Sequence, residues 1–178
     1  MKKLKQILFL LLIPFFGYSQ MQEQECGSVP TQSEIDYLTN TRTDRQTWDI
    51  PESVVKVPVQ HHIVRQSDGS GGLDPNELQA MMNSINSYYI NANIQFFECG
   101  PVNYIDDSGN YNFSSTNSTS FDAAHAVTDV LNVYYFNNVT SSTGGSLCGF
   151  AFFPPNQKGV FMKNSCATNG TTLAHEIG

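Results

Sequence analysis

Alternating and helical patterns of apolar residues divide the middle of the chain into strand, helix and strand. Residues 54–64 (VVKVPVQHHIV) are β-branched and partly alternating, which predicts a strand. A helical stripe follows, made of Leu78, Met81, Met82, Ile85 and Tyr89. Asp74, Pro75 and Glu77 are typical of the start of that helix, and residues 94–99 return to strand character. This β-α-β order predicts two parallel strands joined by a right-handed crossover.

The second half of the chain is predicted to contain a long loop, more strands and a final helix. Residues 106–120 are rich in Asp, Ser, Asn, Gly and Thr, which favours a surface loop. Apolar runs then predict strands at residues 130–136 (the central one), 148–153 and 159–163. Asn169 and Gly170 turn the chain into a helix whose cap is Thr171 or Thr172. Together these elements predict an α/β fold with a mixed, twisted sheet.

The first nineteen residues have the features of a secretory signal peptide. The segment begins with three lysines and continues with an apolar run over residues 7–16. It ends with the small-residue site Gly17-Tyr18-Ser19. The apolar run is too short for a stable membrane anchor, although an uncleaved anchor is the alternative. We therefore predict a secreted protein with no stable anchor after cleavage of residues 1–19. The end of the leader is typical of a bacterial protein.

Residues 20–52 are polar and contain too few apolar side chains to form a core. They are predicted to be an N-terminal extension or pro-segment with one short helix. A capping box of Thr31 and Glu34 begins that helix, and Ile35 and Leu38 give it an apolar edge. The remainder, residues 53–178, is predicted to be one domain.

The charge of the chain excludes one class of partner. Once the three leader lysines are removed, six Lys and Arg remain against sixteen Asp and Glu, a net charge of about −10. Binding to a phosphate backbone depends on clusters of Lys and Arg, so we expect no nucleic-acid partner. Asp106 and Asp107 leave two possibilities open, a Ca²⁺ site or a solvated loop.

Four cysteines in an exported chain suggest two disulfides. Cys148 and Cys166 flank a predicted hairpin, and we favour a bridge between them. The other two are Cys26 and Cys99.

The strongest chemical signal is the pair His175-Glu176 at the start of an apolar helix. In the pattern H-E-x-x-H, two imidazoles one helical turn apart bind one metal ion, and the glutamate serves as a base on a metal-activated water. The second histidine of that pattern would be the residue after Gly178. His61 and His62 lie on opposite faces of a strand and are predicted to be structural, as is His125.

The segment TTLAHEIG, preceded by LNVYYF, LCGFAFFP and GVFMKNS, resembles the start of the active-site helix of metzincin zinc peptidases, particularly the pappalysin/cytophagalysin family. The resemblance covers residues 54–178, the upper, N-terminal subdomain of such a catalytic domain. It implies a sheet with a backing helix and the active-site helix beneath it. The implied activity is that of a secreted Zn²⁺ endopeptidase acting on protein or peptide substrates.

On this resemblance, His175 matches the first zinc ligand and Glu176 the general base. Gly178 falls on a variable position. The other two histidines, the turn glycine and the Met-turn have no counterpart in these 178 residues, which implies a chain truncated within the motif and inactive by itself. The strand that edges the substrate cleft is implied to be Gly159, Val160, Phe161 and Met162. Cys26 matches either a latency cysteine that occupies the zinc or a partner of Cys99 in a disulfide.

Two further functions remain open at this stage. A secreted binding or adhesion module could share the fold without catalysis, and the chain could be an inactive fragment. A histidine directly after Gly178, with another six residues further on, would favour the peptidase.

Overall fold

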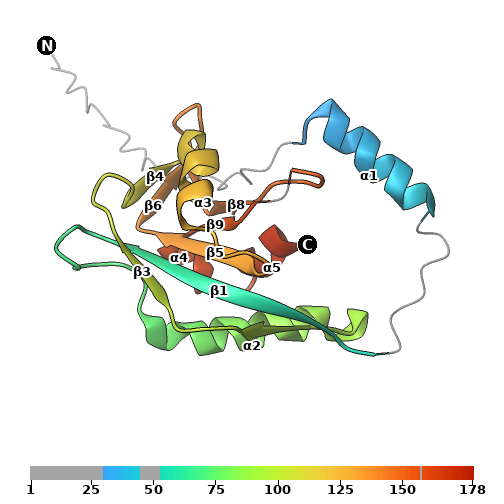
Figure 1. Cartoon of the computed structure of the whole chain (residues 1–178), viewed down its shortest axis with the longest axis horizontal. Helices are drawn as coiled ribbons and strands as arrows, with labels where there is room; N and C mark the ends of the chain where they lie inside the picture. The colour runs from blue at the N-terminus through green and yellow to red at the C-terminus, as the bar shows by residue number, and fades with distance from the viewer. Residues whose placement is uncertain (1–29, 45–52, 157) are drawn as a thin grey trace, which may run out of the picture.

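The computed structural model describes residues 30–44, 53–156 and 158–178. The main sheet is twisted and mixed, and its strands run in the order β2-β1-β5-β9-β8, with β3 also paired to β1 (Figure 1). Its strands are β1 (Val55–Arg65), β2 (Ile94–Glu98), β3 (Asn103–Asp106), β5 (Leu131–Phe136), β8 (Gly149–Phe150) and β9 (Val160–Lys163). Only β8 runs antiparallel to its neighbour. The predicted α/β architecture and the parallel pairing of the first two strands are confirmed.

Helix α2 (Leu78–Tyr89) covers one face of this sheet. The predicted stripe does the packing, because Leu78, Met81, Met82 and Ile85 are buried in a cluster with residues from β1, β5 and β9. Asp74 caps the short 3₁₀ turn Pro75–Glu77 that leads into the helix, since its Oδ1 accepts a hydrogen bond from Asn76 N at 3.0 Å. The prediction of a core-facing helix after Asp74 is confirmed.

Two short helices near the C-terminus lie beside α2 or beside β9, the last strand in the chain. They are α4 (Asn164–Ala167) and α5 (Thr172–Ile177). Leu173 of α5 and Ala167 of α4 belong to the same apolar cluster as the α2 stripe. The backing helix and the predicted site helix therefore share one face of the sheet.

The other face of the sheet is covered by an aromatic cluster. A three-stranded sheet and one helix supply it: β4 (Asn112–Ser114), β6 (Asn138–Thr140), β7 (Ser146–Leu147) and α3 (Ser118–His125). Phe113 stacks on Phe136 with ring centroids 4.2 Å apart, and Phe121 meets Phe113 edge-to-face at 5.2 Å. The prediction of a surface loop at residues 106–120 is wrong at this point. The Phe113 side chain is buried in the core although its neighbours in the sequence are polar, and it lies in the short strand β4.

The N-terminal extension contains α1 (Gln32–Asp44), longer than the short helix predicted there. Its capping box is present, with Thr31 N donating to Glu34 Oε2 at 2.8 Å and Glu34 N donating to Thr31 Oγ1 at 3.4 Å. The predicted apolar edge is largely open to solvent, since Ile35 is 42% exposed.

Candidate functional site

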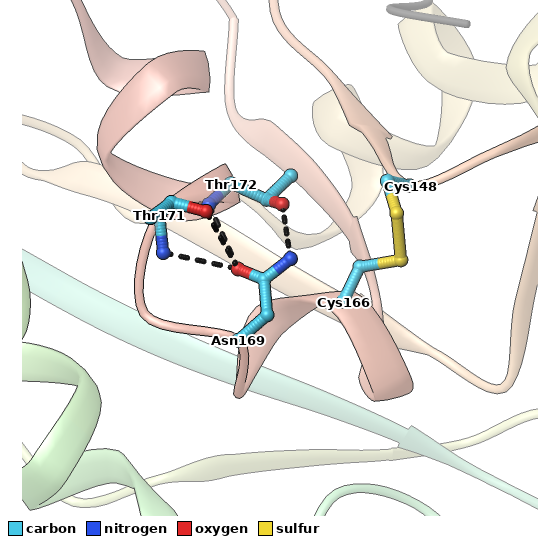
Figure 2. The surroundings of a disulfide bond; sticks show 5 residues. All are labelled: Cys148, Cys166, Asn169, Thr171 and Thr172. Atoms are coloured by element: carbon cyan, nitrogen blue, oxygen red, sulfur yellow. Dashed lines mark hydrogen bonds between the residues drawn. A yellow bond between two sulfur atoms is a disulfide. The ribbon is translucent and has the colours of Figure 1, made fainter. Parts of the chain in front are cut away.

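The predicted site residues His175 and Glu176 lie on α5, whose start is fixed by Asn169. The Asn169 carboxamide oxygen accepts hydrogen bonds from Thr171 N at 3.0 Å and from Thr172 N at 2.9 Å (Figure 2). Its amide nitrogen donates to Thr172 Oγ1 at 2.6 Å. The side chain of Thr171, the residue before the helix, makes no capping hydrogen bond. Asn169 therefore caps the helix in place of the predicted threonines.

A disulfide joins Cys148 to Cys166 just before this cap, with an S–S distance of 1.97 Å and Cα atoms 5.3 Å apart (Figure 2). This is the pairing that the sequence favoured. Cys148 directly precedes β8, and Cys166 lies in α4, three positions before Asn169. The bridge thus ties the start of β8, the outermost strand of the main sheet, to α4, the helix that leads into the turn before α5.

Glu176 is buried, with 8% of its surface exposed. A glycine of β8 makes this burial possible. A Cβ atom placed on Gly149 would lie 3.2 Å from Glu176 Cγ and 2.7 Å from Met162 Sδ. Any larger residue at position 149 would therefore displace the glutamate or the strand.

A pocket of about 350 Å³ opens beside Glu176. It is lined by Asp122, Val130, Leu131, Asn132, Ala151, Phe152, Lys158, Gly159, Val160, Glu176 and Ile177. Three of the residues predicted for the site, Glu176, Gly159 and Val160, are therefore brought together. The pocket is large enough for a side chain of a bound peptide, and its wall carries both signs of charge.

Two charged residues of the pocket wall had no signal in the sequence. Asp122 Oδ1 accepts hydrogen bonds from Tyr134 Oη at 3.0 Å and from Gly159 N at 3.1 Å. The Lys158 ammonium lies 4.3 Å from the centre of the Phe152 ring. Asp122 sits in a helix inside a stretch that is mostly polar, and its role depends on contacts across the fold, so spacing along the chain could not single it out.

The strand predicted to edge a substrate cleft does not lie at the edge of the sheet. β9 pairs with β5 on one side and with β8 on the other, where Gly149 is opposite Met162 and Phe150 is opposite Phe161. Phe161 and Met162 are fully buried, on opposite faces of the sheet. The outermost strand on this side is β8, which the sequence predicted only as an ordinary strand.

The described residues do not make a metal site by themselves. His175 is exposed and supplies one imidazole, and Glu176, the next residue in the chain, is buried. No group of three or more His, Cys, Asp or Glu side chains comes together within the described ranges. A catalytic zinc site uses three protein ligands, and the described residues bring no such set together.

The acidic loop considered for calcium uses its carboxylates for contacts within the protein. Arg65 Nε donates to Asp106 Oδ1 at 2.7 Å. Asp107 Oδ1 accepts from Gly109 N at 2.8 Å, and Asp107 Oδ2 accepts from Asn110 Nδ2 at 2.7 Å. Both carboxylates therefore stabilise the loop as folded.

His61 and His62 point to opposite faces of β1, as predicted. His61 Nδ1 lies 2.9 Å from Tyr135 Oη in the face covered by α2. His62 Nε2 lies 2.9 Å from Asn132 Oδ1, and its ring packs on Tyr134 in the aromatic face. Burial lowers the pKa of both imidazoles, to about 4 for His61. Each imidazole is therefore a neutral core residue at physiological pH.

The N-terminal extension reaches the turn that follows β8. Asn156 Nδ2 donates to Glu34 Oε1 at 3.3 Å. Hydrogen bonds from the backbone and side chain of Thr31, with that from Asn156, hold the pKa of Glu34 below its usual value. Cys26, proposed as a switch, lies outside the described residues. Cys99 is exposed and takes part in no disulfide within the described ranges.

Comparisons with known proteins point to one broad class. No family model matches the chain. Two curated relatives, both named "Extracellular metalloprotease", come from Arthroderma benhamiae and Trichophyton verrucosum. Each is 24% identical over 177 residues, an alignment that covers 88% of this chain and 62% of the relative.

The chain therefore spans about three fifths of the length of these relatives. Neither organism is a bacterium, so the comparisons do not support the bacterial origin predicted from the leader. Within the part of the chain that the structure describes, no helix is long and apolar enough to cross a membrane. At this distance the chain is similar to secreted proteins of the metalloprotease class.

Proposed function

We propose that this chain is the N-terminal part of the catalytic domain of a secreted zinc endopeptidase of the metzincin type, most similar to the pappalysin/cytophagalysin group. One observation carries the proposal. The buried Glu176, directly after His175 on α5, lines a pocket at the end of a mixed sheet. The distant similarity to proteins named extracellular metalloproteases supports it.

In this proposal His175 supplies one imidazole to the zinc ion, and residues beyond Gly178 supply the others. A zinc ion held there would polarise the carbonyl of the scissile peptide. Glu176 accepts the proton of the attacking water and then passes it to the leaving amide nitrogen. Its burial and the close approach of Gly149 to its Cγ restrict where the side chain can lie beside the pocket. The 178-residue chain without the other ligands is expected to be inactive.

The substrate in this proposal is an extended peptide. β8 forms the outer edge of the described sheet, so a peptide can add to it as a further strand through backbone hydrogen bonds. The adjoining pocket, with Phe152 and Lys158 in its wall, would then take one side chain of that peptide. Gly159, directly before β9, and Val160, the first residue of β9, line the same pocket.

The remaining assignments of the sequence belong to the same proposal. Residues 1–19 are a signal peptide, residues 20–52 are a pro-segment or extension, and residues 53–178 are the partial catalytic domain. The contact between Glu34 and Asn156 supports a pro-segment that reaches the pocket side of the domain. Cys26 is then either a ligand that keeps the zinc site latent or the disulfide partner of Cys99.

The test is the variant Glu176→Gln in the secreted full-length protein. We expect zinc to remain bound while cleavage of a denatured protein falls by more than about a thousandfold, since the base is lost but the metal ligand stays. The matched control is Glu77→Gln, which changes an exposed glutamate at the start of α2. Zinc content is measured by elemental analysis beside the activity.

Two results would contradict the proposal. Cleavage that survives Glu176→Gln would remove Glu176 from the mechanism. A full-length protein that neither binds zinc nor cleaves peptides would favour the alternative, a secreted binding or adhesion module on the same fold.

A further inference from the structure

Helix α5 rests on α2 through two hydroxyl groups. Ser84 Oγ donates a hydrogen bond to the carbonyl oxygen of Gly170 at 2.6 Å. Tyr89 Oη donates to the carbonyl oxygen of Ala174 at 2.9 Å. The first contact holds the turn before α5, and the second holds the last turn of α5, directly before His175 and Glu176. The backing helix is thus attached both to the turn before α5 and to α5 itself, the helix that carries the proposed site.

Two glycines allow this close approach. A Cβ atom on Gly170 would lie 3.3 Å from Ser84 Oγ, and the φ of this residue is +80°, which favours glycine. A Cβ atom on Gly178 would overlap the Tyr89 hydroxyl and would lie 3.1 Å from two carbons of its ring. Gly178, which the family pattern leaves as a variable position, is therefore required by its neighbour on α2.

The Tyr89 hydroxyl is a firmly placed donor. Its ring packs edge-to-face on Phe96 of β2, with centroids 5.1 Å apart, so the phenol cannot turn away without breaking an aromatic contact. Burial raises the pKa of the phenol above its usual value, so it stays protonated at any physiological pH. β8 approaches α5 at Glu176, because a Cβ atom on Gly149 would lie 3.2 Å from Glu176 Cγ.

We propose that Tyr89 is a positioning residue for Glu176, and that Gly178 is the packing glycine that makes this possible. The hydroxyl of Tyr89 sets the depth and rotation of the last turn of α5. Gly149 approaches from β8, so the carboxylate of Glu176 has one location relative to the pocket. The inference rests on the proposed peptidase function, because it assigns Tyr89 a role in that reaction.

The first experiment is Tyr89→Phe in the full-length protein. This change removes one hydroxyl and keeps the ring contact with Phe96. We expect kcat to fall about tenfold, because a small displacement of a catalytic group has a large effect on rate, while KM stays within about twofold. The matched control is Tyr88→Phe, which removes the hydroxyl of the neighbouring tyrosine, 56% exposed, and should leave kcat unchanged.

A purely structural role gives a different result. In that case Tyr89→Phe would lower the melting temperature but leave kcat per folded molecule at the wild-type value, and the proposal would be overturned. An equal fall in kcat for Tyr88→Phe would also overturn it.

A second experiment does not depend on activity. Gly178→Ala is compared in the wild type and in Tyr89→Leu, where the hydroxyl and ring that occupy the Cβ position are gone. We expect the melting temperature to fall by about 5 °C in the wild type, and not to fall in the Tyr89→Leu background. An equal fall in both backgrounds would show that Tyr89 and Gly178 are not coupled and would reject the packing. If the coupling is found in a protein that cleaves no peptide, the peptidase function fails while the contact stands.

Discussion

His61 and His62 are neighbours in β1 with different surroundings. Both nitrogens of His62 have partners, Asn132 Oδ1 and Asn103 Nδ2, each at 2.9 Å. His61 is 3% exposed and has one partner, Tyr135 Oη, while its Nε2 has none within the described part of the chain. A protonated imidazole at His61 would place an unpaired charge in the core, which is strongly unfavourable.

This burial predicts loss of stability in mild acid. The pKa of His61 falls to about 4 in the folded chain, from an ordinary value of 6.5, mainly through desolvation and then through repulsion from His62. The unfolded chain therefore binds the extra proton first, so stability is complete above about pH 6.5 and falls as the pH drops toward 4. We expect a loss of about 3 kcal/mol over this range. Urea unfolding at several pH values measures it.

The control for this prediction is His61→Phe, which cannot be protonated. Its absolute stability will differ because Tyr135 Oη loses its partner, but its pH slope between 6.5 and about 4.5 should be much smaller than that of the wild type. The same slope in both proteins would contradict the assignment to His61.

Single residues differ in how far the sequence could reveal them. His175 and Glu176 could be singled out because two adjacent residue types on a helix match the start of a known metal pattern, and their role stays a prediction. Tyr89 was predicted as part of an apolar stripe, but its hydroxyl contact with Ala174 joins positions 85 apart in the chain. Gly149 gave no signal, since its importance arises only when β8 meets Glu176 in the folded chain.

At the scale of elements, local patterns predicted α2, β1 and β5 well, because each of them buries an apolar set of its own. Residues 106–120 were missed because β4 and the start of α3, which they contain, depend on distant partners. Phe113 of β4 and Phe121, further along α3, are separated by polar residues, and both are buried in a cluster with β5 and β9 aromatics such as Phe136. Composition cannot show such a partnership.

The cap of α5 gives a prediction at this scale. Asn169→Ala removes the oxygen that accepts from Thr171 N and Thr172 N, so we expect a loss of about 1 kcal/mol in the free energy of unfolding. Thr171→Ala, whose hydroxyl makes no capping bond, should change stability by less than about 0.5 kcal/mol. Thermal and urea unfolding compare the two variants, and a larger effect from Thr171→Ala would restore the threonine cap that the sequence suggested.

Across the whole molecule, the main sheet separates two kinds of core. One face carries aliphatic and methionine side chains under α2 and α5, and the other carries stacked aromatics under α3 and the small sheet. The disulfide lies beside β8, the outermost strand on this side of the sheet, and joins the residue before β8 to α4. It therefore strengthens the part of the fold with the shortest strands.

We expect the Cys148–Cys166 bridge to contribute about 3 kcal/mol, because it closes a loop of 18 positions and restricts the unfolded chain. The double variant Cys148→Ser with Cys166→Ser should lose this amount in urea unfolding. Cys99→Ser, at an exposed cysteine, should change stability by less than about 0.5 kcal/mol. Equal losses in the two variants would contradict the assignment.

The same bridge has a consequence for how the folded chain responds to a cut in its backbone. The turn between β8 and β9 is exposed at Pro155 and Asn156, and it lies inside the loop that the disulfide closes. If a peptidase breaks one peptide bond in this turn, both polypeptide pieces remain covalently joined, and β8 keeps its place against β9. On a gel the break becomes visible only after reduction. A cut there produces two polypeptide chains that remain one disulfide-linked molecule.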